Sequence, residues 1–159
     1  MRDAYRPRLI AEVVRLHADY YAKHWGFGLP FEAKVALELA DFLLGFREGR
    51  DFMRNVWLDD ARLKGTVSLQ APDDEDGLAH LRWFIVDEAY AGEGLGGQLI
   101  DAAISHARSN GFAGVYLTTF AGLEAARKLY ERSGFQLVTE SQVDQWSGGV
   151  REQRFELRF

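Results

Sequence analysis

The segment 83–100 constrains the fold more than any other part of the chain. An apolar stretch, 83–86, is followed by two acidic residues, a glycine-rich stretch at 92–97 and the start of an apolar helical pattern. Glycine has no Cβ, so backbone N–H groups can approach a ligand closely. The first turn of a helix also has N–H groups without internal partners and a partial positive charge. The segment therefore predicts a strand, a loop and a helix that together bind phosphate.

Two familiar phosphate-binding loops fit this segment poorly. A nucleotide P-loop ends in Gly-Lys-Ser or Gly-Lys-Thr, whereas Gln98 follows the last glycine here. Gly92, Gly94 and Gly97 match the G-x-G-x-x-G pattern of dinucleotide-binding folds, which expects an acidic residue about 20 positions later. Residues 110–119 contain no Asp or Glu. A dinucleotide-binding oxidoreductase stays open as an alternative that NADH binding would test.

Composition limits the kinds of protein to which the chain can belong. A chain of 159 residues is expected to form a single domain, 1–159. It has no cysteine, which excludes disulfides, thiolate metal sites and a cysteine nucleophile, and we expect no metal. The net charge of −5 argues against nucleic acid as a partner. No apolar run approaches 18 residues and residues 1–7 have no apolar core, so we expect no membrane span, no signal peptide and a cytoplasmic location.

Hydrophobic periodicity predicts a chain that mixes helices and strands. Apolar residues recur at helical spacing over 8–24, 31–46, 94–109 and 123–132. Shorter apolar or alternating runs predict strands over 52–58, 63–70, 79–86, 115–120, 135–143 and 150–159. The acidic run at 72–77 is expected to be a solvated loop. The predicted order is therefore ααβββαβαββ.

Two motifs make the chain resemble a known family. The stretch Ala91-Gly92-Glu93-Gly94-Leu95-Gly96 resembles the Gln/Arg-x-x-Gly-x-Gly/Ala loop of the GCN5-related N-acetyltransferases (GNAT). Residues 126–135, ARKLYERSGF, resemble that family's Ala-x-x-Leu-Tyr-x-x-x-Gly-Phe segment, and the two motifs stand in the family's order and at its separation. The resemblance covers roughly 9–159. The overall sequence is also similar to acetyltransferase domains that are fused to MarR-type regulators in bacteria.

The resemblance implies a fold, a cosubstrate and a reaction. The fold is α/β (α+β), with a mixed, curved central sheet and helices on both faces. The cosubstrate is acetyl-CoA, and the acceptor is a primary amine of a small molecule, an amino acid or a peptide. The family also admits homodimers. A non-catalytic acyl-CoA-binding or sensor domain stays open as the alternative function.

The resemblance also assigns the coenzyme A site. Backbone N–H groups of the loop are expected to hold the pyrophosphate, and the strand before it to pair with the pantetheine arm. Ala91 stands where the family usually has Gln or Arg, and Leu123 where it often has Asn. Arg127 would bind the phosphates or else be a surface charge. The expected residues are Phe84, Ile85, Val86, Ala91, Gly92, Glu93, Gly94, Leu95, Gly96, Gly97, Leu123 and Arg127.

Two residues are candidates for proton transfer. Tyr130 matches the family's tyrosine and would protonate the leaving thiolate, because a phenol keeps its proton at neutral pH; the alternative is a core aromatic. His80 is a candidate base for the amine, with an ordinary pKa near 6.5. By strand periodicity His80 should share a face with Arg82, Phe84 and Val86. A water chain in place of His80 is the alternative, and Glu152 and Glu124 are weaker candidates.

Aromatic residues are the candidates for the acceptor site. In the family the first two helices and the last two strands line it. Tyr21, Trp25 and Phe27 surround the first interhelix loop, and Trp146 lies in the turn before the last strand. Such rings can stack on a ligand or surround an ammonium group. Ordinary packing between helices is the alternative explanation.

Overall fold

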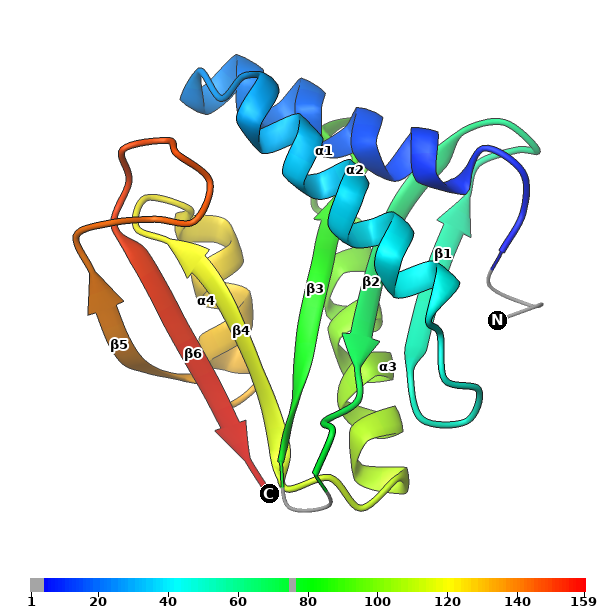
Figure 1. Ribbon diagram of the computed structural model, residues 1–159, viewed down its shortest axis with the longest axis vertical. Helices are drawn as coiled ribbons and strands as arrows, with labels where there is room; N and C mark the ends of the chain where they lie inside the picture. Colours follow the sequence, from blue (N-terminus) through cyan, green and yellow to red (C-terminus); the bar gives the residue numbers. More distant parts are fainter. Residues whose placement is uncertain (1–4, 75–76) are drawn as a thin grey trace.

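The computed structural model describes residues 5–74 and 77–159 (Figure 1). In that part of the chain the elements follow the predicted order, with one short 3₁₀ turn added before the glycine-rich loop. Their bounds are α1 Leu9–Trp25, α2 Leu29–Leu44, β1 Phe52–Trp57, β2 Leu63–Gln70, β3 Leu78–Val86, η1 Glu88–Tyr90, α3 Leu95–Ser109, β4 Gly114–Phe120, α4 Glu124–Arg132, β5 Gln136–Ser141 and β6 Glu152–Arg158.

The predicted elements agree with these bounds to within a few residues. α2 begins and ends two residues before the predicted range 31–46, and β5 and β6 are shorter than the predicted strands 135–143 and 150–159. Asp73 and Asp74 are exposed, as expected of a solvated loop, whereas residues 75–76 of that loop lie outside the described residues. Residues 1–4, which entered the argument against a signal peptide, lie outside them too. No helix of the described chain is long and apolar enough to cross a membrane.

The sheet opens in its middle. Its strand order is β1-β2-β3-β4-β6-β5, and the β3–β4 pair is parallel whereas the other pairs are antiparallel. The parallel pairing extends only from Leu78–Gly114 to His80–Tyr116. Beyond His80 the two strands diverge, which Figure 1 shows as a V between β3 and β4. The β3 backbone from Leu81 onward therefore has no strand on its β4 side.

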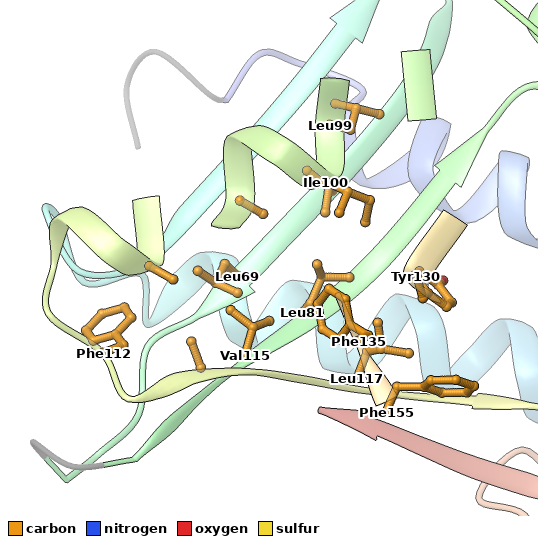
Figure 2. Packing of buried hydrophobic residues seen from close by; sticks show 14 of the residues in the cluster. Leu69, Leu81, Leu99, Ile100, Phe112, Val115, Leu117, Tyr130, Phe135 and Phe155 are labelled. Atoms are coloured by element: carbon orange, nitrogen blue, oxygen red, sulfur yellow. The ribbon is translucent and has the colours of Figure 1, made fainter. Parts of the chain in front are cut away.

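Helices cover both faces of the sheet, as the resemblance implied. α1 and α2 lie together over β1, β2 and β3, whereas α3 and α4 lie behind the sheet (Figure 1). Two apolar clusters result. One lies between the sheet and α3 and α4 and is drawn in Figure 2, with Leu69, Leu99, Ile100 and Phe135 among its members. The other lies under α1 and α2.

A bulge in β3 coincides with the divergence. Ser68 of β2 faces Arg82 and Thr66 faces Ile85, so β3 advances three residues where β2 advances two. Trp83 has φ 46°, a left-handed conformation that is rare for a residue with a side chain. An extra residue in one strand shifts the alternation of side chains beyond it. From Trp83 onward, the side chains of β3 therefore point to the opposite face of the sheet from the one that a regular alternation would give.

This bulge corrects one prediction. Leu81 packs in the cluster toward α3 and α4, but Trp83 and Ile85 pack in the cluster under α1 and α2. Phe84 and Val86 pack against the first cluster. His80 and Arg82 therefore do not share a face with Phe84 and Val86, because the strict period of two breaks at the bulge.

A buried carboxylate fastens α1 to the sheet. Glu12 is 4% exposed, accepts the Leu63 N–H at 3.0 Å and pairs with Arg15 at 2.9 Å. Burial by itself would raise the pKa of Glu12. The hydrogen bonds from Arg15 and Leu63 and the charges of Arg15 and Arg62 outweigh burial, so the pKa lies below its ordinary value of 4.5.

We expect Glu12→Gln to lower the free energy of unfolding by about 2 kcal/mol at neutral pH, since the charge-assisted bonds are lost. A depressed native pKa gives stability that is present above the unfolded pKa and is lost as pH falls through the native pKa. The difference from wild type should therefore shrink on acidification. Urea unfolding across the acid range measures it.

Asp19→Asn is the matched control. Asp19 also pairs with Arg15, at 3.5 Å, but its side chain is 71% exposed. Exposed pairs contribute little, so this variant should unfold within about 0.5 kcal/mol of wild type. Equal destabilisation by both variants would contradict the role given to Glu12.

Candidate functional site

Two adjoining hollows occupy the opening between β3 and β4. The first, called the loop cleft, has a volume of about 500 Å³ and lies between the end of β3, the glycine-rich loop and α4. The second, called the aromatic pocket, has a volume of about 120 Å³ and lies under α1 and α2. Tyr21, Phe84 and Tyr130 line both hollows. A ligand in the cleft can therefore present its end to the pocket.

The loop is shaped to expose backbone N–H groups. Asp87 caps η1 by accepting the Ala89 N–H at 3.0 Å. Gly92 and Gly94 have φ 85° and 80°, which favours glycine, and α3 begins at Leu95 without a side-chain cap. In the described part of the chain, the N–H groups of residues 92–97 donate no backbone hydrogen bond. They are therefore free for an anion.

The glycines of the loop have two different roles. A Cβ on Gly92, Gly94 or Gly97 would meet nothing within 4 Å, so open space lies before these residues. A Cβ on Gly96 would come within 3.2 Å of Leu129 and 3.4 Å of Phe84. Gly96 therefore permits α3 to pack closely against β3 and α4.

Most of the expected coenzyme residues line the loop cleft, and two do not. Phe84, Ile85, Val86, Ala91, Gly92, Gly94, Leu95, Gly96, Gly97 and Leu123 all contribute to its wall. Glu93 is not in the wall and pairs with Lys64 at 3.6 Å. Arg127 is also not in the wall, because its guanidinium pairs with Glu131 at 2.8 Å on the same helix.

The loop cleft contains a cation that was not among the residues expected from the sequence. Arg132, one turn beyond Arg127, lines the cleft and is exposed. Among the described residues it has no ion pair or hydrogen bond. Helical spacing could have found it, since Ala125, Leu129 and Arg132 lie on one face of α4 and all line the cleft.

Tyr130 stands where cleft and pocket meet. It is 6% exposed, and its ring packs edge-on against Phe84 and Phe135 and at a tilt against Phe155; Figure 2 shows the last two rings beside it. Burial raises the pKa of the Tyr130 phenol above its ordinary value of 10. The hydroxyl therefore keeps its proton at neutral pH and can donate it. Tyr130 is thus a buried core aromatic, and its role as a proton donor stays a prediction.

A second phenol lies beside it. Tyr21 reaches the junction from α1, and burial raises its pKa, with the proximity of Tyr130 adding to the effect. Its ring packs against Phe27, Phe31 and Phe120 at 5.0–5.9 Å. The Tyr21 phenol is therefore protonated at neutral pH, and the neighbouring rings hold it in position.

His80 lies in the aromatic pocket but does not have the expected pKa. Burial, together with the charges of Arg82 and Arg154, lowers its pKa to about 3. Its ring stacks on Tyr116 at 4.3 Å. The premise of a pKa near 6.5 is therefore wrong for His80, which is neutral at pH 7 and a weak base.

The aromatic candidates for the acceptor site divide into two groups. Trp146 lines the aromatic pocket together with Tyr21. Trp25 and Phe27 line neither hollow and instead pack on Phe120, at 4.8 and 5.4 Å. Phe120 also contacts Trp146 at 5.6 Å. Trp25 and Phe27 thus support the wall that Tyr21 and Trp146 form.

A carboxylate organises the segment that carries Trp146. The oxygens of Asp144 accept the N–H groups of Trp146, Gly148 and Val150 at 2.8–3.1 Å. Burial opposes the ionised form, but these hydrogen bonds outweigh it and hold the pKa of Asp144 below its ordinary value. The weaker base candidate Glu152 accepts the Gln145 N–H at 3.0 Å, so it also fixes this segment.

Acidic and imidazole groups of the described residues form no cluster that could hold a metal ion. Glu124 lies in the first turn of α4, exposed and outside both hollows. The charged residues that line the aromatic pocket are instead Lys34, Glu38 and Arg82, and Glu38 is paired to both cations.

We expect Asp144→Ala to loosen the segment 144–150, because three N–H groups lose their acceptor. Amide hydrogen exchange of this segment should become faster while exchange in β3 stays unchanged, and the free energy of unfolding should fall by about 1 kcal/mol. Gln142→Ala, an exposed neighbour, should leave exchange as in wild type. Unchanged exchange in the Asp144 variant would contradict the role of this carboxylate.

Comparisons with known sequences agree with this geometry. The model of the acetyltransferase (GNAT) family matches residues 10–135. The chain is 38% identical over 69 residues to a spermine/spermidine N(1)-acetyltransferase of Bacillus subtilis (strain 168), covering 43% of this chain and 45% of that protein. It is 29% identical over 136 residues to the uncharacterized N-acetyltransferase YycN of the same organism, covering 79% and 87%. The chain thus spans less than half of the first relative.

Solved structures share the fold at low sequence identity. A GNAT-family acetyltransferase from Staphylococcus aureus Mu50 has a TM-score of 0.74 at 16% identity, covering 98% of this chain and 97% of that one. RimL, a ribosomal L7/L12 alpha-N-protein acetyltransferase in complex with coenzyme A, has a TM-score of 0.72 at 14% identity, covering 98% and 92%. With a family model over most of its length and this fold, the chain belongs to the acetyltransferase (GNAT) family.

Proposed function

We propose that this chain transfers an acetyl group from acetyl-CoA to a primary amine. The observation that carries the proposal is the meeting of the loop cleft and the aromatic pocket at Tyr130. One hollow offers free N–H groups for phosphate and the other offers a wall of aromatic rings. A thioester at the junction would lie between a proton donor and an amine.

Different regions of the loop cleft would bind the successive groups of coenzyme A. The free N–H groups of residues 92–97 and the N-terminus of α3 would bind the pyrophosphate. The pantetheine arm has amide groups that can pair with the β3 edge at 84–86, as an added strand does. Arg132 would contact a phosphate.

The reaction requires one bond to form and one to break. The amine nitrogen attacks the thioester carbonyl carbon, and a free N–H of β3 stabilises the developing oxyanion. The C–S bond then breaks, and the leaving thiolate takes the proton of the Tyr130 hydroxyl. The amine nitrogen loses a proton to water, and Tyr130 regains one from solvent. The products are the N-acetyl amide and free coenzyme A.

The aromatic pocket favours a narrow amine-bearing group. Its volume of about 120 Å³ accommodates a short arm rather than a large body. Tyr21, Trp83, Phe120 and Trp146 present ring surfaces that attract an ammonium group before it is deprotonated. Because one relative is a spermine/spermidine N(1)-acetyltransferase, the panel of amines to be tested as acceptors includes polyamines as well as amino acids and short peptides.

Tyr130→Phe tests the catalytic part of the proposal. We expect kcat for thiol release to fall about 10²-fold, because the thiolate loses its proton donor. The Kd for acetyl-CoA, measured by isothermal titration, should stay within about twofold, since the ring is retained. The substrates are acetyl-CoA and the amine panel, with free thiol as the readout.

The same titration separates the alternatives. Wild-type protein should bind acetyl-CoA and CoA but not NADH, and NADH binding would favour the dinucleotide alternative. Acetyl-CoA binding without thiol release on any amine would favour a sensor domain, to which the departures at Ala91 and Leu123 lend weight. Failure to bind acetyl-CoA would overturn the proposal.

Arg132→Gln tests the cation of the loop cleft. We expect the Kd for acetyl-CoA to rise about fivefold, because one exposed charge–phosphate contact is lost. The effect should weaken in high salt. Arg127→Gln is the matched control on the same helix, and its Kd should match that of wild type because Arg127 is engaged by Glu131. A larger effect at Arg127 would reverse the assignment.

A further inference from the structure

A histidine that the sequence analysis passed over lies in the aromatic pocket. His17 is on α1 and is 6% exposed, yet it lines the pocket together with Tyr21 and Tyr130. Its ring stacks on Tyr21, with 6.3 Å between ring centroids and 20° between their planes. It therefore lies next to the residue that borders both hollows.

The hydrogen bond of this ring fixes where its proton is. Nδ1 lies 2.8 Å from the carbonyl oxygen of Val13. A carbonyl oxygen only accepts, so Nδ1 carries the hydrogen and donates it. Nε2 of the neutral ring then has a lone pair and no hydrogen. No group among the described residues donates to Nε2.

The ring stays in this state at working pH. Burial lowers the pKa of His17 to about 4, and the bond to Val13 offsets only part of that effect. Among the described residues, Ser68 Oγ is the buried side-chain N or O atom without a partner, so Nε2 of His17 is not sealed off, and a ligand in the pocket can donate a hydrogen bond to it. His17 thus offers the pocket a permanent hydrogen-bond acceptor.

The other histidines do not offer the same group. His24, which is exposed, contacts Glu88 at 2.6 Å, and His106, which is half-buried, contacts the Arg50 carbonyl at 2.8 Å; both lie outside the pocket. His80 shares the pocket, but its ring is stacked on Tyr116, and burial together with the charges of Arg82 and Arg154 lowers its pKa further than that of His17. Neither arginine contributes to the pKa of His17.

We propose that Nε2 of His17 accepts a hydrogen bond from the N–H of the acceptor amine and so holds the nitrogen beside the thioester. This inference rests on the proposed function and names the residue that recognises the acceptor. Its partner class is a primary amine or ammonium head group, which has more than one N–H to donate. Tyr21, stacked on His17, would contact the carbon chain next to that nitrogen.

The test begins with a direct readout of Nε2. Uniformly ¹⁵N-labelled protein, saturated with CoA so that no turnover occurs, is titrated with n-butylamine. The Nε2 resonance of His17 should shift as its lone pair accepts a hydrogen bond, while those of His24 and His106 stay in place. The pH is held constant, so titration of the ring does not contribute.

Variants then test the consequence for catalysis. His17→Phe keeps an aromatic ring on Tyr21 but removes the acceptor, and we expect KM for n-butylamine to rise about tenfold with the Kd for acetyl-CoA unchanged. His17→Gln supplies a side-chain carbonyl oxygen and should recover most of the loss. His106→Phe is the matched control and should behave as wild type.

The outcomes are distinct. An unshifted Nε2 resonance, or equal kinetics in the His17→Phe and His106→Phe variants, would overturn the role of His17 while acetyl transfer stands. A shifted resonance in wild-type protein that releases no thiol would support the binding role and overturn the proposed function. A shift together with the KM change and its rescue by glutamine supports both.

Discussion

The bulge at Arg82 and Trp83 is the constraint on which the site depends. Trp83 adopts a left-handed backbone conformation, which costs on the order of 1–2 kcal/mol for a residue with a side chain. Its indole packs against Phe42 at 5.3 Å and under the Arg82 guanidinium at 4.2 Å, and these contacts offset that cost. Below this point β3 pairs with β4, and above it the strands part.

The same bulge distributes the side chains of β3 between two hollows. His80, Arg82 and Trp83 line the aromatic pocket, whereas Ile85 and Val86 line the loop cleft, and Phe84 borders both. A regular strand would have kept its alternation and its neighbour, and the free backbone edge at 84–86 would be absent. The proposed site of acetyl transfer is thus a consequence of one irregularity in a sheet.

Much of this architecture follows from the sequence. The order of helices and strands was predictable because the apolar residues keep helical or alternating spacing. The anion-binding loop was predictable because glycines precede an apolar helix. The bulge could not be predicted, because the local alternation of apolar and polar residues does not indicate a left-handed backbone conformation at Trp83. The low pKa of His80 could not be predicted either, because one of its causes is the charge of Arg154, which lies on a strand far along the chain. The proposed roles of Arg132 and His17 could not be predicted from the sequence either, because they depend on where α4 and α1 lie relative to the two hollows.

The central claim is that the opened β3 edge and the glycine-rich loop form one binding surface for acetyl-CoA. Amide hydrogen exchange with and without acetyl-CoA tests it most directly, because the proposed contacts are made by backbone N–H groups. The account predicts slower exchange at 84–86 and at 92–97, with β1 and β2 unchanged. Protection confined to other segments, or acetyl-CoA binding that leaves both of these segments unprotected, would contradict it.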